Sequence, residues 1–264
     1  MGLLQQNLAK YTHIYEQNHG YITDAMLVNW FGKSAVKRTE LEDMSFTKRS
    51  AVVIVGVSGS GKTHFVREFV KTHPNFILCS HDECFAKARI ELSGKRTEYE
   101  LDNRMNENLE KMIRSAAKRN NNVIFDGLFV NPVVRAALLN TLRTMGFEIH
   151  VVYITLNTLM SNIKLYASLK AIQTQAHRLY SIKHKTDLSA QQIVTNRHKA
   201  IELYAEDNNL SAEEAAIQLS NTPEVVRLAK EGLENSIYEI ECHLVQQQEL
   251  NQAFMLGADY YYEL

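Results

Sequence analysis

The chain has 264 residues, of which 45% are apolar and 22% are charged, and it contains only 11 Gly and 3 Pro. These values are close to the average of globular proteins, so they exclude a disordered, a collagen-like and a low-complexity chain. The sequence has no run of 18 apolar residues, and its first twelve residues lack the basic-then-apolar order of a signal peptide, so we expect a cytoplasmic protein without a membrane partner. Cys79, Cys84 and Cys242 form no CxxC pair, which argues against a disulfide framework and a zinc site.

The net charge of −1 combines two regions of opposite sign. Residues 1–199 hold 27 Lys and Arg against 17 Asp and Glu, whereas residues 200–264 hold 2 against 13. A basic body attracts anions such as nucleotides or nucleic acid, and an acidic segment repels them. Two solvated surfaces of opposite sign are the alternative interpretation.

Hydrophobic patterns predict strands that alternate with helices. The β-branched run 51–57 is typical of a strand buried on both faces, and Leu101, Met105 and Leu109 give one apolar face to a long helix. This alternation predicts an α/β fold with a mostly parallel, helix-covered sheet. In chain order we expect helices over 3–45, a strand at 51–57, a helix at 62–71, a strand at 75–80, a helix at 98–119, a strand at 122–126, a helix at 132–146, a strand at 148–155, helices from 157 to about 256, and an edge strand or frayed tail at 260–264.

The domain boundaries that we predict are soft, because no repeat and no Gly/Ser-rich or Pro-rich linker divides the chain. We expect an N-terminal helical extension over residues 1–46. A core with its lid follows over residues 47–185, and an acidic C-terminal helical region over residues 186–264.

A phosphate-binding motif is the strongest signal in the chain. Residues 56–63 read GVSGSGKT, which matches G-x-x-x-x-G-K-[ST], and they lie between the predicted strand and helix. In such a loop the backbone N–H groups converge on a phosphate, and the dipole of the following helix adds to their field. We expect Lys62 to reach the β- and γ-phosphates of ATP or GTP and the Thr63 hydroxyl to be a Mg²⁺ ligand. The predicted nucleotide contacts are Gly56, Ser58, Gly59, Ser60, Gly61, Lys62, Thr63 and His64.

Two acidic residues follow strands that neighbour this loop in the chain. A kinase needs a carboxylate that orients the acceptor hydroxyl and takes its proton, and such groups lie at the carboxyl ends of the strands in open α/β sheets. Asp82 comes just after the second strand and Asp126 ends the third, which fits a base and a metal-side carboxylate. The alternatives are a helix N-cap for Asp82, with Glu83 able to exchange roles with it, and a turn residue for Asp126.

Residues 51–166 resemble the P-loop kinases that include phage polynucleotide 5′-hydroxyl kinase and the zeta toxins. The resemblance is carried by GVSGSGKTHFVREFV, NFILCSHDE, LDNRMNE and VIFDGLFVNPVVRAALLNTLRTMGFEIHVVYITL. It implies a three-layer P-loop NTPase fold of the kinase type with added N- and C-terminal helices. It also implies catalytic roles for Lys62, for Asp82 as general base and for Arg135 as a contact to the acceptor, and a metal-supporting role for Asp126.

The chain departs from this group in the predicted lid. Group members carry arginines on the helix after the fourth strand, where they neutralise the migrating phosphoryl group. The matching stretch 157–169 has Lys164 and no arginine, and further basic residues follow at Lys170, Arg178, Lys183 and Lys185. We therefore expect a displaced basic lid, with a solvated basic helix face as the alternative.

Residues 210–232 resemble a helix-turn-helix, with Thr222 as the cap of a second helix that begins at Pro223. Four glutamates against Arg227 and Lys230 oppose binding to DNA phosphates, which favours a structural hairpin. His64 and His81 lie next to motif residues, so each is either a ligand contact or an ordinary surface or core residue.

Three functions follow from these patterns. The first is a Mg²⁺-dependent phosphotransferase that uses ATP or GTP and a hydroxyl acceptor, with a nucleic-acid 5′ end or a nucleotide among the candidate acceptors. The second is phosphorylation of a nucleotide sugar, as the zeta-toxin resemblance implies. The third is a nucleotide-binding regulatory or DNA-binding protein without kinase activity. The sequence leaves the oligomeric state open.

Overall fold

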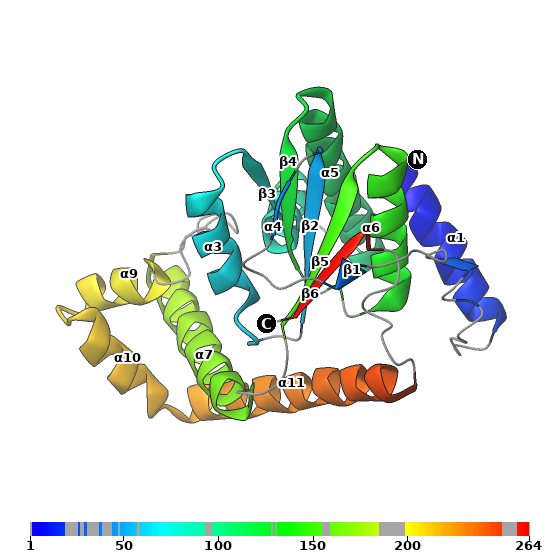
Figure 1. Cartoon of the computed structure of the whole chain (residues 1–264). Helices are drawn as coiled ribbons and strands as arrows, with labels where there is room; N and C mark the ends of the chain where they lie inside the picture. Colours follow the sequence, from blue (N-terminus) through cyan, green and yellow to red (C-terminus); the bar gives the residue numbers. More distant parts are fainter. Residues whose placement is uncertain are drawn as a thin grey trace.

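A computed structural model gives the fold of the chain (Figure 1). The structure describes residues 2–18, 26, 29–30, 37–38, 44–46, 48–56, 59–92, 97–127, 129, 131–154, 159–184, 199–249 and 258–263. Most of the predicted N-terminal helical segment after residue 18 lies outside the described residues. Within them, no helix is both long and apolar enough to cross a bilayer.

A parallel sheet forms the centre of the molecule, in the order β1-β6-β5-β2-β4-β3. Strand β2 lies inside the sheet, between β5 and β4. Its six residues are all buried, as the β-branched run predicts. Its residues pair in register with both neighbours, so that Val53 lies between Val151 and Phe125. The strands are β1 (Lys37–Arg38), β2 (Ser50–Val55), β3 (Phe76–Ser80), β4 (Asn122–Asp126), β5 (Glu148–Tyr153) and β6 (Tyr260–Glu263).

Helices cover both faces of the sheet. Alternate residues of β2 point to opposite faces, so they contribute to two separate cores. Val53 and Val55 belong to a core shared with α1, α4, α5 and α6, whereas Val52 and Ile54 belong to a core shared with α3. The predicted three-layer P-loop NTPase fold is therefore confirmed. These helices are α1 (Leu3–Gln17), α3 (Lys62–Thr72), α4 (His81–Glu91), α5 (Glu98–Lys118) and α6 (Pro132–Thr144).

A second group of helices forms its own core at one end of the sheet. We call α9, α10 and α11 the C-terminal helical subdomain; it packs against the long helix α7 (Figure 1). Small and aliphatic residues of α7, among them Ala171, Ile172 and Ala176, are buried against it. The bounds are α7 (Leu159–His184), α9 (Lys199–Asp207), α10 (Ala212–Ser220) and α11 (Pro223–Glu249).

The end of the chain returns to the sheet. The sequence predicts a helical region over residues 186–264 that ends in either an edge strand or a frayed tail. In the structure, β6 lies between β5 and β1 in the core sheet, so the end of this region is a strand and belongs to the core. The backbone N–H of Ile149 donates to Asp259 Oδ2 at 2.7 Å, and Tyr262 is 1% exposed. The last strand therefore belongs to the core, because its aromatic side chains are buried there.

Candidate functional site

The phosphate-binding motif joins β2 to α3, as the sequence predicts. Gly59 and Gly61 have φ angles of +80° and +99°, a region that residues with a side chain rarely adopt. Gly61 is the N-cap of α3, so the amino end of this helix opens directly onto the loop. Ser58, a predicted nucleotide contact, lies outside the described residues. The backbone angles at Gly59 and Gly61 therefore explain why the motif has glycine at these two positions.

A cavity of about 310 Å³ opens beside this loop. Its wall is assembled from four parts of the chain: the loop with the start of α3, the start of α4, the end of β4, and α7. It brings together five residues predicted from the sequence for separate roles: Lys62, Thr63, His64, Asp82 and Asp126. The lining residues are Gly59, Gly61, Lys62, Thr63, His64, His81, Asp82, Asp126, Gly127, Tyr166 and Lys170.

Thr63 and Asp126, the two residues predicted to hold Mg²⁺, lie together at one side of the cavity. The Thr63 hydroxyl donates to Asp126 Oδ1 at 3.3 Å, although the two residues are 63 positions apart in the chain. Strands β2 and β4 are adjacent, which places the end of β4 beside the loop that follows β2. Hydroxyl and carboxylate oxygens are ligands that Mg²⁺ prefers, so these residues fit the predicted ion. No group of three or more His, Cys, Asp and Glu fit to hold a metal occurs among the described residues, so an ion here would also depend on phosphate oxygens and water.

The start of α4 supplies the acidic side of the cavity. The N-cap of α4 is Ser80, whose hydroxyl accepts from the N–H of Glu83 at 3.3 Å, so Asp82 is not the cap. Asp82 is exposed and lines the cavity, whereas Glu83 is not among the lining residues. Burial, together with the nearby charges of Asp126 and Asp82, raises the pKa of Glu83. The structure therefore brings three carboxylates close together, and of Asp82 and Glu83 it is Asp82 that lines the cavity.

His81 and Gly127 form a wall that the sequence only partly indicated. A Cβ atom at Gly127 would lie 3.0 Å from the Cβ of His81 and 3.0 Å from the Phe129 ring, so a side chain there would force the wall to move. The rings of His81 and Phe129 meet edge to face, 6.2 Å apart. Burial lowers the pKa of His81 despite the nearby charges of Asp82 and Asp102, so this side chain is neutral at pH 7.

Arg135, which the resemblance implies as a contact to the acceptor, is not among the residues that line the cavity. It lies in the first turns of α6, is 0% exposed, and donates from Nη1 to the carbonyl oxygen of Phe129 at 2.7 Å. Burial lowers the pKa of Arg135 to about 9. Its side chain is buried, as are Leu138 and Leu142 on the same helix.

Helix α7 provides the remaining wall through Tyr166 and Lys170. Of the basic residues expected in a displaced lid, Lys170 lines the cavity. Arg178 instead bonds Glu224 at 3.0 Å, and Lys183 contacts Asp207 at 3.4 Å. Lys164 is exposed and does not line the cavity, and the predicted Lys185 lies outside the described residues.

Comparisons with known proteins give one family match and similar solved structures. Residues 52–162 match a family described as an AAA domain. No curated protein matches the chain. A solved structure from a study of the PezAT chromosomal toxin-antitoxin system of the human pathogen Streptococcus pneumoniae is similar at 16% identity and a TM-score of 0.40, over 93% of this chain and 96% of that chain.

The family match runs from β2 to the start of α7 and includes the phosphate-binding motif, but it ends before Tyr166 and Lys170, the cavity residues of α7. It agrees with the P-loop resemblance found in the sequence, which is thereby confirmed for the domain and its fold. Residues 52–162 of this chain therefore match an AAA domain, and the helix-covered parallel sheet that they build has a P-loop NTPase-like α/β fold.

Proposed function

We propose that the chain is a Mg²⁺-dependent phosphotransferase that moves the γ-phosphate of ATP or GTP to a hydroxyl acceptor. The observation that carries this proposal is the meeting of Lys62, Thr63, Asp126 and Asp82 around one cavity, with Thr63 Oγ1 3.3 Å from Asp126 Oδ1. A motor or switch protein needs the first three residues. Transfer to an alcohol additionally requires a carboxylate in the same cavity that can take the proton of the alcohol.

Each side chain has a role in the proposed reaction. Lys62, which is 7% exposed, binds the β- and γ-phosphates as a nearly buried point charge. Thr63 and Asp126 hold Mg²⁺, which neutralises phosphate charge when it is bound. Lys170 approaches from α7, where it compensates charge on the migrating group.

Asp82 orients the acceptor and takes its proton. The acceptor oxygen forms a bond to the γ-phosphorus while the bond from that phosphorus to the bridging β,γ-oxygen breaks. The electron pair of the broken bond leaves with the nucleoside diphosphate. The hydroxyl proton passes to the Asp82 carboxylate, so the atoms and charges balance.

The proposal is tested by incubating the purified chain with γ-labelled ATP, Mg²⁺ and a panel of alcohols that includes oligonucleotide 5′ ends, nucleosides and nucleotide sugars. We expect transfer to one class and its loss in Lys62→Ala and in Asp82→Asn. Nucleotide binding without transfer to any acceptor would favour the regulatory alternative. Unchanged transfer in both variants would reject the assigned roles.

The structure gives no support to DNA binding by residues 210–232. Helices α10 and α11 bury Ala215, Leu219 and Val225 in the core that they share with α7 and α9. Glu224, at the start of α11, is held by Arg178 and Arg227. The hairpin therefore has a structural role in packing, and we do not propose it as a reader.

A further inference from the structure

Helix α7 rests directly on the phosphate loop. A Cβ atom at Gly59 would lie 3.4 Å from the Cβ of Tyr166 and 3.5 Å from the Cα of Ile163. Tyr166 and Lys170, one turn apart on this helix, both line the cavity. The position of a single turn of α7 therefore sets where two cavity residues lie.

The same turn of α7 also rests on α11. A Cβ atom at Gly232 would lie 3.6 Å from the Cβ of Ala167, which directly follows Tyr166 in the chain. Gly232 thus lets α11 lie close to α7 where α7 meets the phosphate loop. Closely packed interfaces of this kind transmit a displacement, because they leave no space in which to absorb it.

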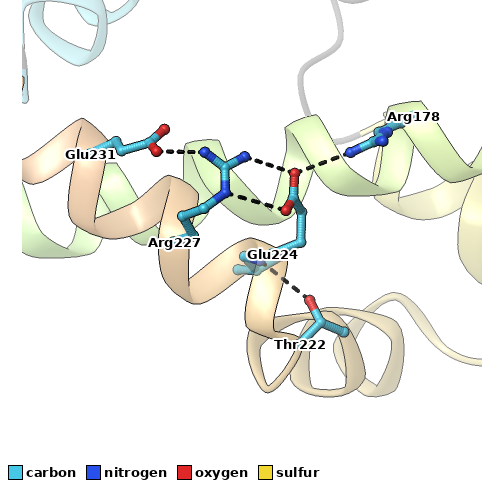
Figure 2. Close-up of polar contacts among 6 residues, drawn as sticks. Arg178, Thr222, Glu224, Arg227 and Glu231 are labelled. Atoms are coloured by element: carbon cyan, nitrogen blue, oxygen red, sulfur yellow. Dashed lines mark hydrogen bonds and ion pairs between the residues drawn. The ribbon is translucent and has the colours of Figure 1, made fainter.

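An ion-pair network fixes the start of α11 on α7 two turns after Lys170 (Figure 2). Glu224 accepts from Arg178 of α7 at 3.0 Å and from Arg227 of its own helix at 2.8 Å. Arg227 also bonds Glu231, and the Thr222 hydroxyl accepts from the N–H of Val225 at 3.4 Å, which caps α11. Helix α7 is thus held to α11 at two points, Ala167 and Arg178.

We propose that the C-terminal helical subdomain positions Tyr166 and Lys170 in the nucleotide cavity by holding α7 against the phosphate loop. This inference rests on the proposed nucleotide-binding function and gives the acidic end of the chain a role in it. Gly232 and Glu224 are positioning residues, because they act through α7 and do not line the cavity. By linkage, a bound nucleotide that contacts α7 must in turn stabilise the packing of α11.

The direct test compares Gly232→Leu with Gly232→Ala by calorimetric titration with Mg-ATP. A methyl group at 3.6 Å is in ordinary contact, and alanine favours helix, so Gly232→Ala should bind within twofold of the parent chain and be more stable to heat. The larger leucine side chain displaces α7, and we expect at least tenfold weaker binding. Equal affinity in a folded Gly232→Leu variant, verified by circular dichroism, would overturn the inference.

A second test does not depend on whether the leucine variant folds. Hydrogen exchange of the unaltered chain should slow in residues 223–238 of α11 when Mg-ATP is added, and remain unchanged in α1. Exchange in α11 that does not respond to bound nucleotide would contradict the coupling. If the unaltered chain binds no Mg-ATP at all, the proposed function fails and this inference fails with it.

A matched pair of variants isolates the ion-pair link. Glu224 and Glu231 both bond Arg227, but of these two bonded carboxylates Glu224 is the one whose described contacts include α7. Glu224→Gln should weaken Mg-ATP binding about two- to threefold, because exposed ion pairs contribute little. Glu231→Gln, with the same loss of charge, should leave affinity unchanged. Equal effects of the two substitutions would exclude a specific role for the link to Arg178.

Discussion

Two polar regions of the same sheet differ in what their side chains face. At the carboxyl ends of β2, β3 and β4, polar groups surround a cavity, and Thr63 and Asp82 are exposed to it. Between β5 and β6, polar groups face each other: His150 is 0% exposed, and its Nδ1 lies 3.0 Å from the Tyr262 hydroxyl. The first arrangement leaves room for a ligand and the second leaves none. Substitutions in the first region should therefore change activity, and substitutions in the second should change stability.

The largest expected effect is on kcat, and it distinguishes Asp82 from Glu83 as the general base. Asp82→Asn removes the proposed base, so kcat should fall by roughly 10²- to 10⁴-fold, the usual contribution of a general base. Glu83→Gln should lower kcat far less, because Glu83 does not line the cavity. Both variants should unfold near the temperature of the parent chain. The reverse order of the two effects would transfer the role of base to Glu83.

The next effect concerns the buried cluster and its dependence on pH. Burial, offset in part by the charge of Asp259, lowers the pKa of His150 to about 4. The unfolded chain, with an ordinary pKa of about 6.5, then binds a proton that the folded chain does not, so stability falls as the pH drops from about 6.5 to about 4. The maximum loss is about 3 kcal/mol.

Urea unfolding at several pH values measures this loss. His150→Gln keeps a hydrogen-bonding side chain but does not titrate, so its free energy of unfolding should fall less steeply over the same interval. The acidic neighbours Glu148 and Asp259 are present in both proteins, so the comparison of variant with parent removes most of their effect. Identical slopes would show that His150 is not the group responsible.

A smaller loss of activity distinguishes two lysines of α7. Lys170 lines the cavity and Lys164 does not. Lys170→Ala should lower kcat/KM by roughly 10- to 100-fold, because a cation facing the migrating phosphoryl group is lost. Lys164→Ala, one and a half turns earlier on the same helix, serves as the control and should remain close to the parent chain. Similar rates in both variants would show that Lys170 does not compensate charge on the migrating phosphoryl group.

The smallest effect concerns the anchor of α1 on α5. The Glu110 carboxylate accepts from the N–H groups of Leu3 and Leu4, both at 2.9 Å, and from Arg114 Nε at 2.8 Å. Burial opposes its ionisation, but the N–H groups of Leu4 and Leu3 and the Arg114 side chain together lower the pKa of Glu110. This carboxylate acts as a helix cap, so Glu110→Ala should cost about 1 to 2 kcal/mol.

Chemical denaturation of Glu110→Ala beside Glu107→Ala measures this cost. Glu107 lies one turn earlier on α5 and pairs with Arg104 on the same helix at 2.9 Å. Its removal should have the smaller effect, and phosphotransfer should be unchanged in both variants. Equal stabilities would show that α1 does not depend on this contact.

The parts of the site predicted from the sequence follow from local signals. GVSGSGKT sits between a buried strand and a helix, and in a parallel sheet the residues that follow neighbouring strands meet at one edge. This reasoning predicts that Thr63, Asp82 and Asp126 lie near one another, and all three line the cavity. The same logic could have found Gly127, which directly follows Asp126.

The missed parts depend on contacts between distant segments. Tyr166 reaches the cavity because α7 packs on Gly59, about 100 residues earlier in the chain, and the local pattern around α7 does not indicate this contact or which basic residue of the predicted lid lies beside it. The sequence around Arg135 does indicate that its side chain is buried. This residue stands three and seven residues before Leu138 and Leu142, on the apolar stripe of its helix, and this spacing favours a buried side chain.

Calorimetric titration of the unaltered chain and of Lys62→Ala with ATP and GTP in the presence of Mg²⁺ tests the central claim most directly. We predict saturable binding of at least one nucleotide, and at least tenfold weaker binding in the variant with no loss of folded structure. The absence of binding of either triphosphate to the unaltered chain would contradict the account.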